Sequence, residues 1–230
     1  MKNRIINTWR DPYDGGFSTC RPKQITIKSG LTVLVGCNGS GKTTLLHNIR
    51  EELKKENIPC HLYDNLHDGG SHSWGEAAFN DNWAFVATSM TASEGENINM
   101  NIGNLATKLA EFRDTGRISD KSSRLADIFN DKPYEVPDTK ERWLLLDAVD
   151  SGFSVDNVIE LKNFFEILIK DFEERGYELY IVVSANEFEL AREEDCFDVM
   201  NGKYIRFTGY DDFRGFIIKS REKKDRRYKK

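Results

Sequence analysis

Long apolar runs are missing from this 230-residue sequence. No stretch of about 18 apolar residues occurs, which excludes a membrane-spanning helix. No apolar segment follows the basic start at residues 1–4, so we expect no secretory signal. The four cysteines, Cys20, Cys37, Cys60 and Cys196, are scattered without paired spacing. This pattern argues against a disulfide framework and indicates reduced thiols in a cytoplasmic protein.

An excess of positive charge is also lacking. The net charge of −5 argues against a surface that is basic all over and made for nucleic acid. Residues 219–230 are a strongly basic exception. This tail is a candidate for contact with nucleic-acid phosphates, and the alternative is a frayed, solvated terminus. The length fits one domain, or one domain with a small lobe.

Apolar segments of two periodicities alternate along the chain. Strands are expected at residues 24–27, 31–35, 84–88, 143–147 and 179–183, and helices after residue 42, at 97–112 and at 158–172, the last one stopping at Gly176. Asn201-Gly202 predicts a hairpin turn. Residues 114–140 are polar and hold two prolines, so they are expected to form an irregular excursion or a small lobe. Strands that alternate with helices predict an α/β fold with a mostly parallel sheet.

A glycine-rich segment follows the second expected strand. Residues 36–43, Gly-Cys-Asn-Gly-Ser-Gly-Lys-Thr, match the phosphate-loop pattern G-x-x-x-x-G-K-[ST]. Glycines let backbone amides surround anionic oxygens, and the start of the next helix attracts negative charge. Lys42 is predicted to reach the β and γ phosphates, and Thr43 to offer its hydroxyl to Mg²⁺. The predicted nucleotide-binding residues here are Gly36, Asn38, Gly39, Ser40, Gly41, Lys42, Thr43 and Thr44.

The strand at residues 143–147 ends in Asp147. In α/β proteins the carboxyl ends of parallel strands meet at one edge of the sheet, beside a phosphate loop. An acid at that place holds Mg²⁺ in phosphate-loop enzymes. Asp147 is therefore the second predicted metal ligand, with ATP and Mg²⁺ as the predicted cofactors.

Three segments together resemble ATP-binding-cassette (ABC) ATPases. Residues 36–46 are similar to that family's phosphate loop, and residues 144–154, Leu-Leu-Leu-Asp-Ala-Val-Asp-Ser-Gly-Phe-Ser, resemble its Walker B strand and D-loop. Between them, Ser93-Glu94-Gly95-Glu96 is similar to the signature motif. The resemblance extends from the first strand to about Tyr204. It is strongest toward soluble cassettes of DNA-repair and chromosome-maintenance ATPases and toward stand-alone cassettes of phage and bacterial genomes.

The resemblance implies a P-loop NTPase fold over residues 1–218, with a mostly parallel central sheet, an antiparallel edge subdomain and a small helical lobe. The lobe would cover about residues 66–140 and carry the signature. It further implies a homodimer that encloses two ATP molecules, in which Ser93, Gly95 and Glu96 contact the partner's nucleotide. The phosphate loop is followed by no glutamine, since Gln24 precedes it, so the glutamine loop that couples transporter cassettes to a membrane domain is lacking.

Two departures from the family concern catalysis. Ala148 stands where the family has its catalytic glutamate, and Asn186 where it has the switch histidine. Losing a positioned base lowers a rate by about 100- to 10,000-fold, so we expect slow or absent hydrolysis. Asp150, Glu94, Glu96 or Glu187 is the alternative source of a water-positioning carboxylate. The predicted catalytic set is Lys42, Asp147, Asp150 and Asn186, and the alternative function is a nucleotide-binding adaptor or inhibitor without turnover.

A cluster of potential metal ligands lies in a polar segment. Cys60, His61, His67 and His72 are close in sequence, but their spacing matches no standard zinc site, and ordinary loop residues are the favoured interpretation. His67, Asp68 or His72 is also a candidate for sensing the γ-phosphate. Trp9, Tyr13 and Phe17 are candidates for stacking on adenine, and the choice between ATP and GTP stays open.

Overall fold

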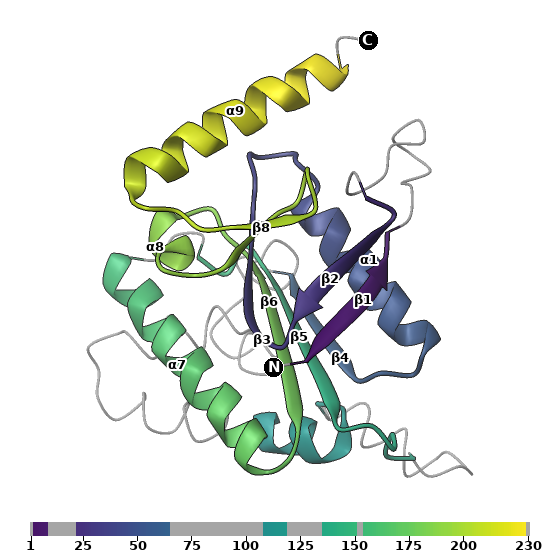
Figure 1. Cartoon of the computed structure of the whole chain (residues 1–230). Coiled ribbons are helices and arrows are strands. Elements are labelled where there is room, and N and C mark those ends of the chain that lie inside the picture. Colours follow the sequence, from purple (N-terminus) through teal and green to yellow (C-terminus); the bar gives the residue numbers. More distant parts are fainter. Residues whose placement is uncertain (1, 9–21, 65–107, 119–134, 151–153, 229–230) are drawn as a thin grey trace, which may run out of the picture.

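A computed structural model describes residues 2–8, 22–64, 108–118, 135–150 and 154–228 (Figure 1). The strands are β1 (Asn3–Asn7), β2 (Gln24–Lys28), β3 (Gly30–Val35), β4 (Cys60–Asp64), β5 (Glu141–Asp147), β6 (Glu178–Ser184), β7 (Cys196–Asp198) and β8 (Lys203–Ile205). The helices are α1 (Lys42–Lys55), α7 (Val155–Glu174), α8 (Phe188–Ala191) and α9 (Tyr210–Tyr228), and residues 108–115 are also helical.

Six strands form the central sheet in the order β4-β5-β6-β3-β7-β8. Every neighbouring pair is parallel except β7 and β8, which are antiparallel. Strands β1 and β2 form a separate antiparallel pair. The predicted α/β fold with a mostly parallel central sheet and an antiparallel part is thus confirmed.

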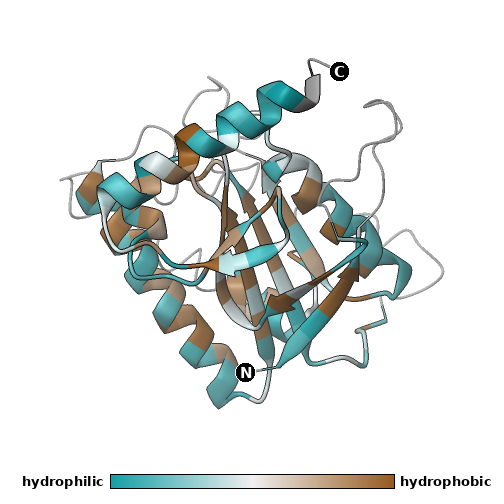
Figure 2. Ribbon diagram, turned by 45° about the horizontal axis from the view of Figure 1, so that its top comes forward, coloured by the Kyte–Doolittle hydropathy of each residue, from teal (hydrophilic) through white to brown (hydrophobic). Residues whose placement is uncertain are grey.

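Helices cover both faces of this sheet. Leu145 packs in a cluster with the apolar face of α1, while its neighbours Leu144 and Leu146 pack in a second cluster with α7. Successive side chains of a strand point to opposite faces, so α1 and α7 lie on opposite sides. Figure 2 shows the hydrophobic strands between two helices whose outward sides are hydrophilic. Burial on both faces explains the continuous apolar sequence of the strands.

The apolar face of α1 was predicted correctly. Leu45, Leu46, Ile49 and Leu53 recur at helical spacing, and all four are fully buried. They pack against the sheet, including Leu34 of the strand that precedes the phosphate loop. This packing fixes the axis of the helix whose first turn ends the loop.

Helix α7 differs from its prediction at one position. Val158, Phe165, Leu168 and Phe172 are buried as expected, whereas Ile159 is 43% exposed. Ile159 directly follows Val158, so it is rotated by about 100° from the side that faces the sheet. The helix ends at Glu174, and the residue at the predicted stop has the left-handed conformation that suits a glycine (φ 76°).

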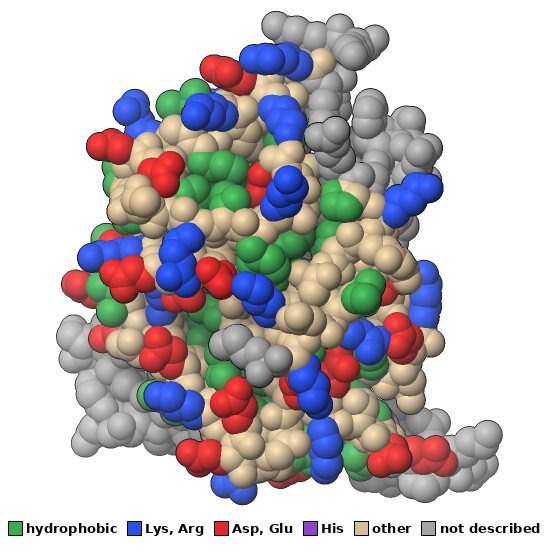
Figure 3. Space-filling model, viewed as in Figure 1, with side chains coloured by type: hydrophobic (Ala, Val, Ile, Leu, Met, Phe, Trp, Pro, Cys, Tyr) green, Lys and Arg blue, Asp and Glu red, His purple; other side chains and the backbone are tan. Residues whose placement is uncertain are grey.

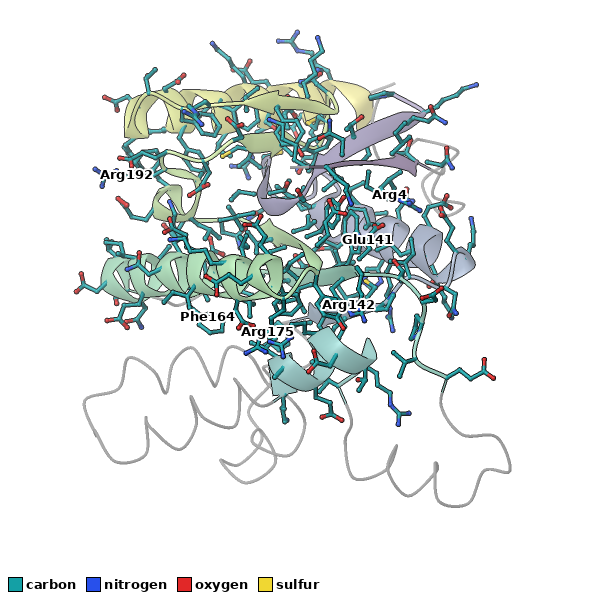
Figure 4. All side chains as sticks on the ribbon, turned by 60° about the horizontal axis from the view of Figure 1, so that its bottom comes forward. Arg4, Glu141, Arg142, Phe164, Arg175 and Arg192 are labelled. Atoms are coloured by element: carbon teal, nitrogen blue, oxygen red, sulfur yellow. The ribbon has the colours of Figure 1, made fainter. Side chains whose placement is uncertain are left out.

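Strand β5 begins at Glu141, two residues before its predicted start. Arg142 is fully buried because its guanidinium donates to four carbonyl oxygens, those of Phe112, Arg113, Thr139 and Glu141. Figure 4 shows Arg142 directed toward the helix at residues 108–115. On the other side of the sheet, the Trp143 and Tyr180 rings are stacked with centroids 4.2 Å apart. Because its guanidinium is hydrogen-bonded, Arg142 can be buried, and β5 begins before the apolar residues that predicted it.

The predicted hairpin is present as β7 and β8. Asp198 is paired with Lys203, so the loop has four residues, and Asn201-Gly202 is its second half. Gly202 has φ 65°, and its amide donates to the Asp198 carbonyl at 2.8 Å. The loop is longer than the two-residue turn that this dipeptide commonly forms, because the Asp198 carboxylate accepts from the Met200 amide within it.

Helix α9 contradicts the interpretation of the basic tail as a frayed terminus. Residues 219–228 continue the helix that begins at Tyr210, so the expected boundary between residues 218 and 219 falls inside α9. Within this segment Ser220 is only 6% exposed. The side of the helix that holds Ser220 is therefore packed, although most neighbouring residues are charged and exposed.

Several predicted features lie outside the described residues. They are the strand at residues 84–88, the start of the helix at 97–112, the signature residues Ser93, Gly95 and Glu96, and the aromatic residues Trp9, Tyr13 and Phe17. Most of the predicted lobe at residues 66–140 lies there as well. Its last described helical residues are 114 and 115, which were expected to be irregular.

Candidate functional site

The phosphate-loop sequence connects β3 to α1, at the carboxyl end of a strand with neighbours on both sides. Gly36 approaches Ser40 closely, since a Cβ there would lie 2.4 Å from Ser40 Oγ. Gly41 has φ 96° and is the N-cap of α1, so no capping side chain covers the first-turn amides. The first turn also has no acidic residue. This helix start is therefore free to attract an external anion.

Ser40 in the same loop has an unsatisfied side chain. Its hydroxyl oxygen is buried, and no partner within the described part of the chain forms a hydrogen bond with it. A buried polar group without a partner is costly to folding by about 1–3 kcal/mol. Ligand oxygens would supply the missing partner.

Lys42 begins α1, and its side chain is nearly buried. Its ammonium donates to the Gly36 carbonyl at 2.9 Å, so the side chain folds back over the loop. Burial lowers the pKa of Lys42, while the nearby charges of Asp147, Cys37 and Asp150 act in the opposite direction. The structure thus brings the predicted lysine and Asp147 into one electrostatic environment.

Asp147 ends β5 and is 4% exposed. The Ser184 hydroxyl, at the end of the neighbouring strand β6, donates to Asp147 Oδ1 and accepts from the Ala148 amide at 2.7 Å. This bridge fixes the rotamer of the carboxylate. Ser184 was not singled out in the sequence, although a polar residue closing the apolar run of β6 was a usable signal.

Ala148, which the sequence resemblance aligned with a catalytic glutamate, has an unusual backbone conformation. Its φ is 52°, in the left-handed region that side chains rarely adopt. The methyl group offers no proton acceptor. The chain therefore turns sharply just after Asp147.

Asp150 lies two residues further and is fully buried. Its Oδ2 accepts from the amides of Asn186 and Glu187 at 2.7 and 2.8 Å. Burial raises the pKa of Asp150, and these amides oppose the shift. These hydrogen bonds connect the segment after β5 to the segment after β6. They favour a role for Asp150 in positioning the backbone of Asn186 and Glu187. Both Asn186 and Glu187 have exposed side chains.

A cleft of about 440 Å³ opens between the start of the phosphate loop and α9. Its lining residues are Gly36, Cys37, Asn38, Asn186, Glu187, Phe188, Tyr210, Phe213, Arg214, Ile217, Ile218 and Arg221. Helix α9 was missed from the sequence. Phe213, Phe216, Ile217 and Ser220 recur at helical spacing, and this pattern was the available signal.

Two further findings concern metals and membranes. Within the described ranges no group of three His, Cys, Asp or Glu side chains is placed to hold a metal ion. Of the four residues considered as zinc ligands and interpreted as ordinary loop residues, only Cys60 and His61 are described, at the start of β4. None of the helices that the structure describes is both long and apolar enough for a membrane span.

Comparisons with known proteins give little more. No family model matches the chain. No curated protein matches it either. Several solved structures are similar, among them a nucleotide-free ATP-binding cassette from an ABC transporter, at 15% identity and a TM-score of 0.42, covering 95% of this chain and 97% of that chain.

Proposed function

We propose that this protein binds ATP with Mg²⁺ in the loop from Gly36 to Thr44. The observation that carries the proposal is the buried Ser40 hydroxyl without a partner, inside a loop whose sequence and place between β3 and α1 suit a phosphate chain. Thr43 and Asp147 would hold the Mg²⁺ ion, which prefers such oxygen ligands. The ion would supply positive charge to the phosphates when bound.

Isothermal titration calorimetry tests this proposal. Wild-type protein should bind Mg-ATP, and Lys42→Ala should weaken binding by at least about tenfold, because the ammonium is the only side-chain cation within the loop. Lys54→Ala is the matched control, since it removes an exposed cation from the last turn of the same helix. Equal binding by wild type and Lys42→Ala would refute the site.

We propose further that the chain is an ABC-type cassette that forms an ATP-dependent homodimer. The support is the sequence likeness of residues 36–46, 144–154 and Ser93-Glu94-Gly95-Glu96 to the family motifs. In the sandwich, Ser93, Gly95 and Glu96 would contact the nucleotide of the partner subunit. Sedimentation velocity should show a dimer only with Mg-ATP, and Ser93→Arg should abolish it. A monomer under both conditions would contradict the sandwich.

We propose that hydrolysis is slow and that ATP acts mainly as a binding switch. Ala148 cannot accept a proton. Asp150 Oδ2 accepts from the backbone amides of Asn186 and Glu187, and its Oδ1 accepts from the Asn186 side chain. Single-turnover assays should give a rate well below that of ordinary cassettes. Ala148→Glu should raise it by at least about tenfold, whereas Ala148→Gln should not. A fast wild-type rate would refute the switch and point to another carboxylate.

The alternative function is that of an adaptor or inhibitor that stays bound to its nucleotide without turnover.

A nucleic-acid partner is a further proposal, and its candidate contact surface is α9. Lys219 and Arg226 are exposed and lie on one face of this helix. Lys219→Gln with Arg226→Gln should weaken binding to an oligonucleotide and flatten its salt dependence. These changes leave the buried Ser220 intact, unlike deletion of residues 219–230. No salt-dependent binding by the wild type would exclude this output.

A further inference from the structure

Helix α9 is fastened to the phosphate loop by two contacts. The Cys37 amide donates to the Ser220 hydroxyl at 3.2 Å, and the Lys224 ammonium donates to the Asn38 carbonyl at 2.9 Å. Ser220 and Lys224 are four residues apart, so they lie on one side of the helix. Figure 1 shows the connection from β3 to α1 rising directly beneath α9. The helix is therefore held over the beginning of the loop.

An adjoining side of α9 forms one wall of the cleft. Its lining positions, residues 210, 213, 214, 217, 218 and 221, recur at helical spacing. The opposite wall consists of residues 36–38 of the loop, together with Asn186 and Glu187. One ligand group in this cleft would thus be reached by the phosphate loop and by α9.

The cleft wall on α9 carries two arginines whose charge is not neutralised locally. Arg214 and Arg221 are exposed, and within the described part of the chain no acid lies within ion-pair distance of either. By contrast, Arg226 of the same helix is paired with Glu222. Glu187 is the single acid among the cleft residues. Lys and Arg side chains predominate over α9 in Figure 3. The two arginines lie in one cleft with a loop that suits phosphate, and this arrangement favours the binding of an anion.

Sheet order indicates which end of a bound nucleotide would meet these arginines. Strand β6 lies between β3, which leads into the loop, and β5, which ends in Asp147. The segment after β6 therefore stands between the phosphate loop and the acid expected to hold Mg²⁺. An ion held there would supply positive charge to the terminal phosphates of a triphosphate. Asn186 in this segment lines the cleft, so the cleft adjoins the terminal phosphate rather than the nucleoside.

We propose that Arg214 and Arg221 bind the terminal phosphate of ATP within the same chain, so that α9 distinguishes ATP from ADP. This inference rests on the proposed nucleotide site. The apolar residues Phe213 and Ile217 lie beside the arginines on the wall of the cleft. ADP lacks the group that the arginines would contact. Release of that contact would follow loss of the γ-phosphate.

Calorimetric titrations with Mg-ADP and with Mg-adenylyl imidodiphosphate, a triphosphate analogue that resists hydrolysis, test the inference. The double variant Arg214→Ala/Arg221→Ala should lower the preference for the triphosphate by at least about tenfold and leave ADP affinity unchanged. Arg192→Ala/Arg206→Ala is the matched control, because it removes two exposed arginines that do not line the cleft. Arg214→Lys/Arg221→Lys should keep part of the preference, since it retains charge but loses the planar fork.

The outcomes separate this inference from the nucleotide site itself. An unchanged triphosphate preference in the alanine variant, or an equal loss for both nucleotides, overturns the role of α9 while the site stands. Loss of oligonucleotide binding with an unchanged preference would assign the arginines to nucleic acid and would also overturn it. If wild type binds neither nucleotide, or if Lys42→Ala binds both like wild type, the nucleotide site fails and the inference fails with it.

Discussion

Ser220 and Cys37 are 183 positions apart, and a hydrogen bond from the Cys37 amide to the Ser220 hydroxyl joins them at 3.2 Å. The hydroxyl itself donates to the Met200 sulfur at 3.2 Å. The group is buried, so its partners have no access to water that could replace it. One short side chain thus ties the C-terminal helix to both the phosphate loop and the β7–β8 hairpin.

Ser220→Ala should therefore lower the free energy of unfolding by about 1–3 kcal/mol, because the Cys37 amide loses its acceptor. Urea denaturation followed by fluorescence measures this change. Lys219→Ala, at the exposed neighbouring position, should stay within about 0.5 kcal/mol of wild type. Equal stabilities for Ser220→Ala and wild type would show that α9 is not held by this bond.

Asp150 gives a second prediction. Asp150→Ala leaves the amides of Asn186 and Glu187 without their acceptor and should lower stability by about 2–4 kcal/mol. Asp150→Asn keeps one carbonyl oxygen that can accept from both amides, so its loss should be smaller. Urea denaturation at pH 7 should rank wild type as the most stable, the asparagine variant next and the alanine variant last. If the alanine variant is as stable as wild type, Asp150 does not position these segments.

The same residue predicts a dependence on pH. Burial raises the pKa of Asp150 in the folded protein above its value in the unfolded chain. The folded state therefore binds a proton more readily, and this group's contribution to stability is lost as pH rises through the folded pKa. The side chain in Asp150→Asn does not titrate, so wild type should gain stability relative to this variant as pH falls from 7 toward 4. A constant difference across that range would contradict the shift.

Ala148 predicts a stabilising substitution. A non-glycine residue in the left-handed region is strained by roughly 1–2 kcal/mol, whereas glycine is not, though glycine loses more entropy on folding. Ala148→Gly should therefore raise stability by about 0.5–1 kcal/mol in thermal denaturation. Ala191→Gly, in α8, should lower stability instead, since it weakens a helix and removes a buried methyl group. Changes of the same sign would refute the strain at Ala148.

Replacement of Arg142 is predicted to cause a large loss of stability. Arg142→Ala removes a guanidinium that donates to four carbonyl oxygens and leaves a cavity, so stability should fall by about 3–5 kcal/mol. Arg142→Lys should recover only part, because an ammonium cannot match the planar fork. Arg175→Ala, at an exposed arginine bonded to Asp171, is the control and should change stability by less than about 1 kcal/mol. A mild effect of Arg142→Ala would contradict the buried network.

Periodicity and motif spacing predicted the parts of the fold that depend on local sequence. Leu45, Leu46 and Ile49 are spaced for a helix and pack as expected, and the residues from Leu144 to Leu146 form a buried strand. What escaped prediction depends on partners far along the chain. Glu141 and Arg142 are charged, yet they extend β5, because two of the carbonyls that satisfy Arg142 belong to Phe112 and Arg113, 30 and 29 positions earlier.

The candidate site also combines residues that local sequence indicates with residues that act through distant partners. The candidate phosphate loop and Asp147 were proposed from spacing, since phosphate binding requires fixed residue types at fixed positions. Ser184 and Ser220 could not be found that way, because each acts through a partner on another strand or loop, Asp147 and Cys37. The amphipathic part of α9 was visible in principle, but its charged second half concealed one buried serine.

The position of β3 has a consequence for folding. This strand is paired with β6 and β7, and Gly30 lies opposite Tyr180, 150 positions later. No strand close in sequence stabilises it within the central sheet of the described residues, so a very long chain closure must precede its pairing. The segment leading into the phosphate loop should gain exchange protection late in refolding, after local elements such as α1 and α7 have formed.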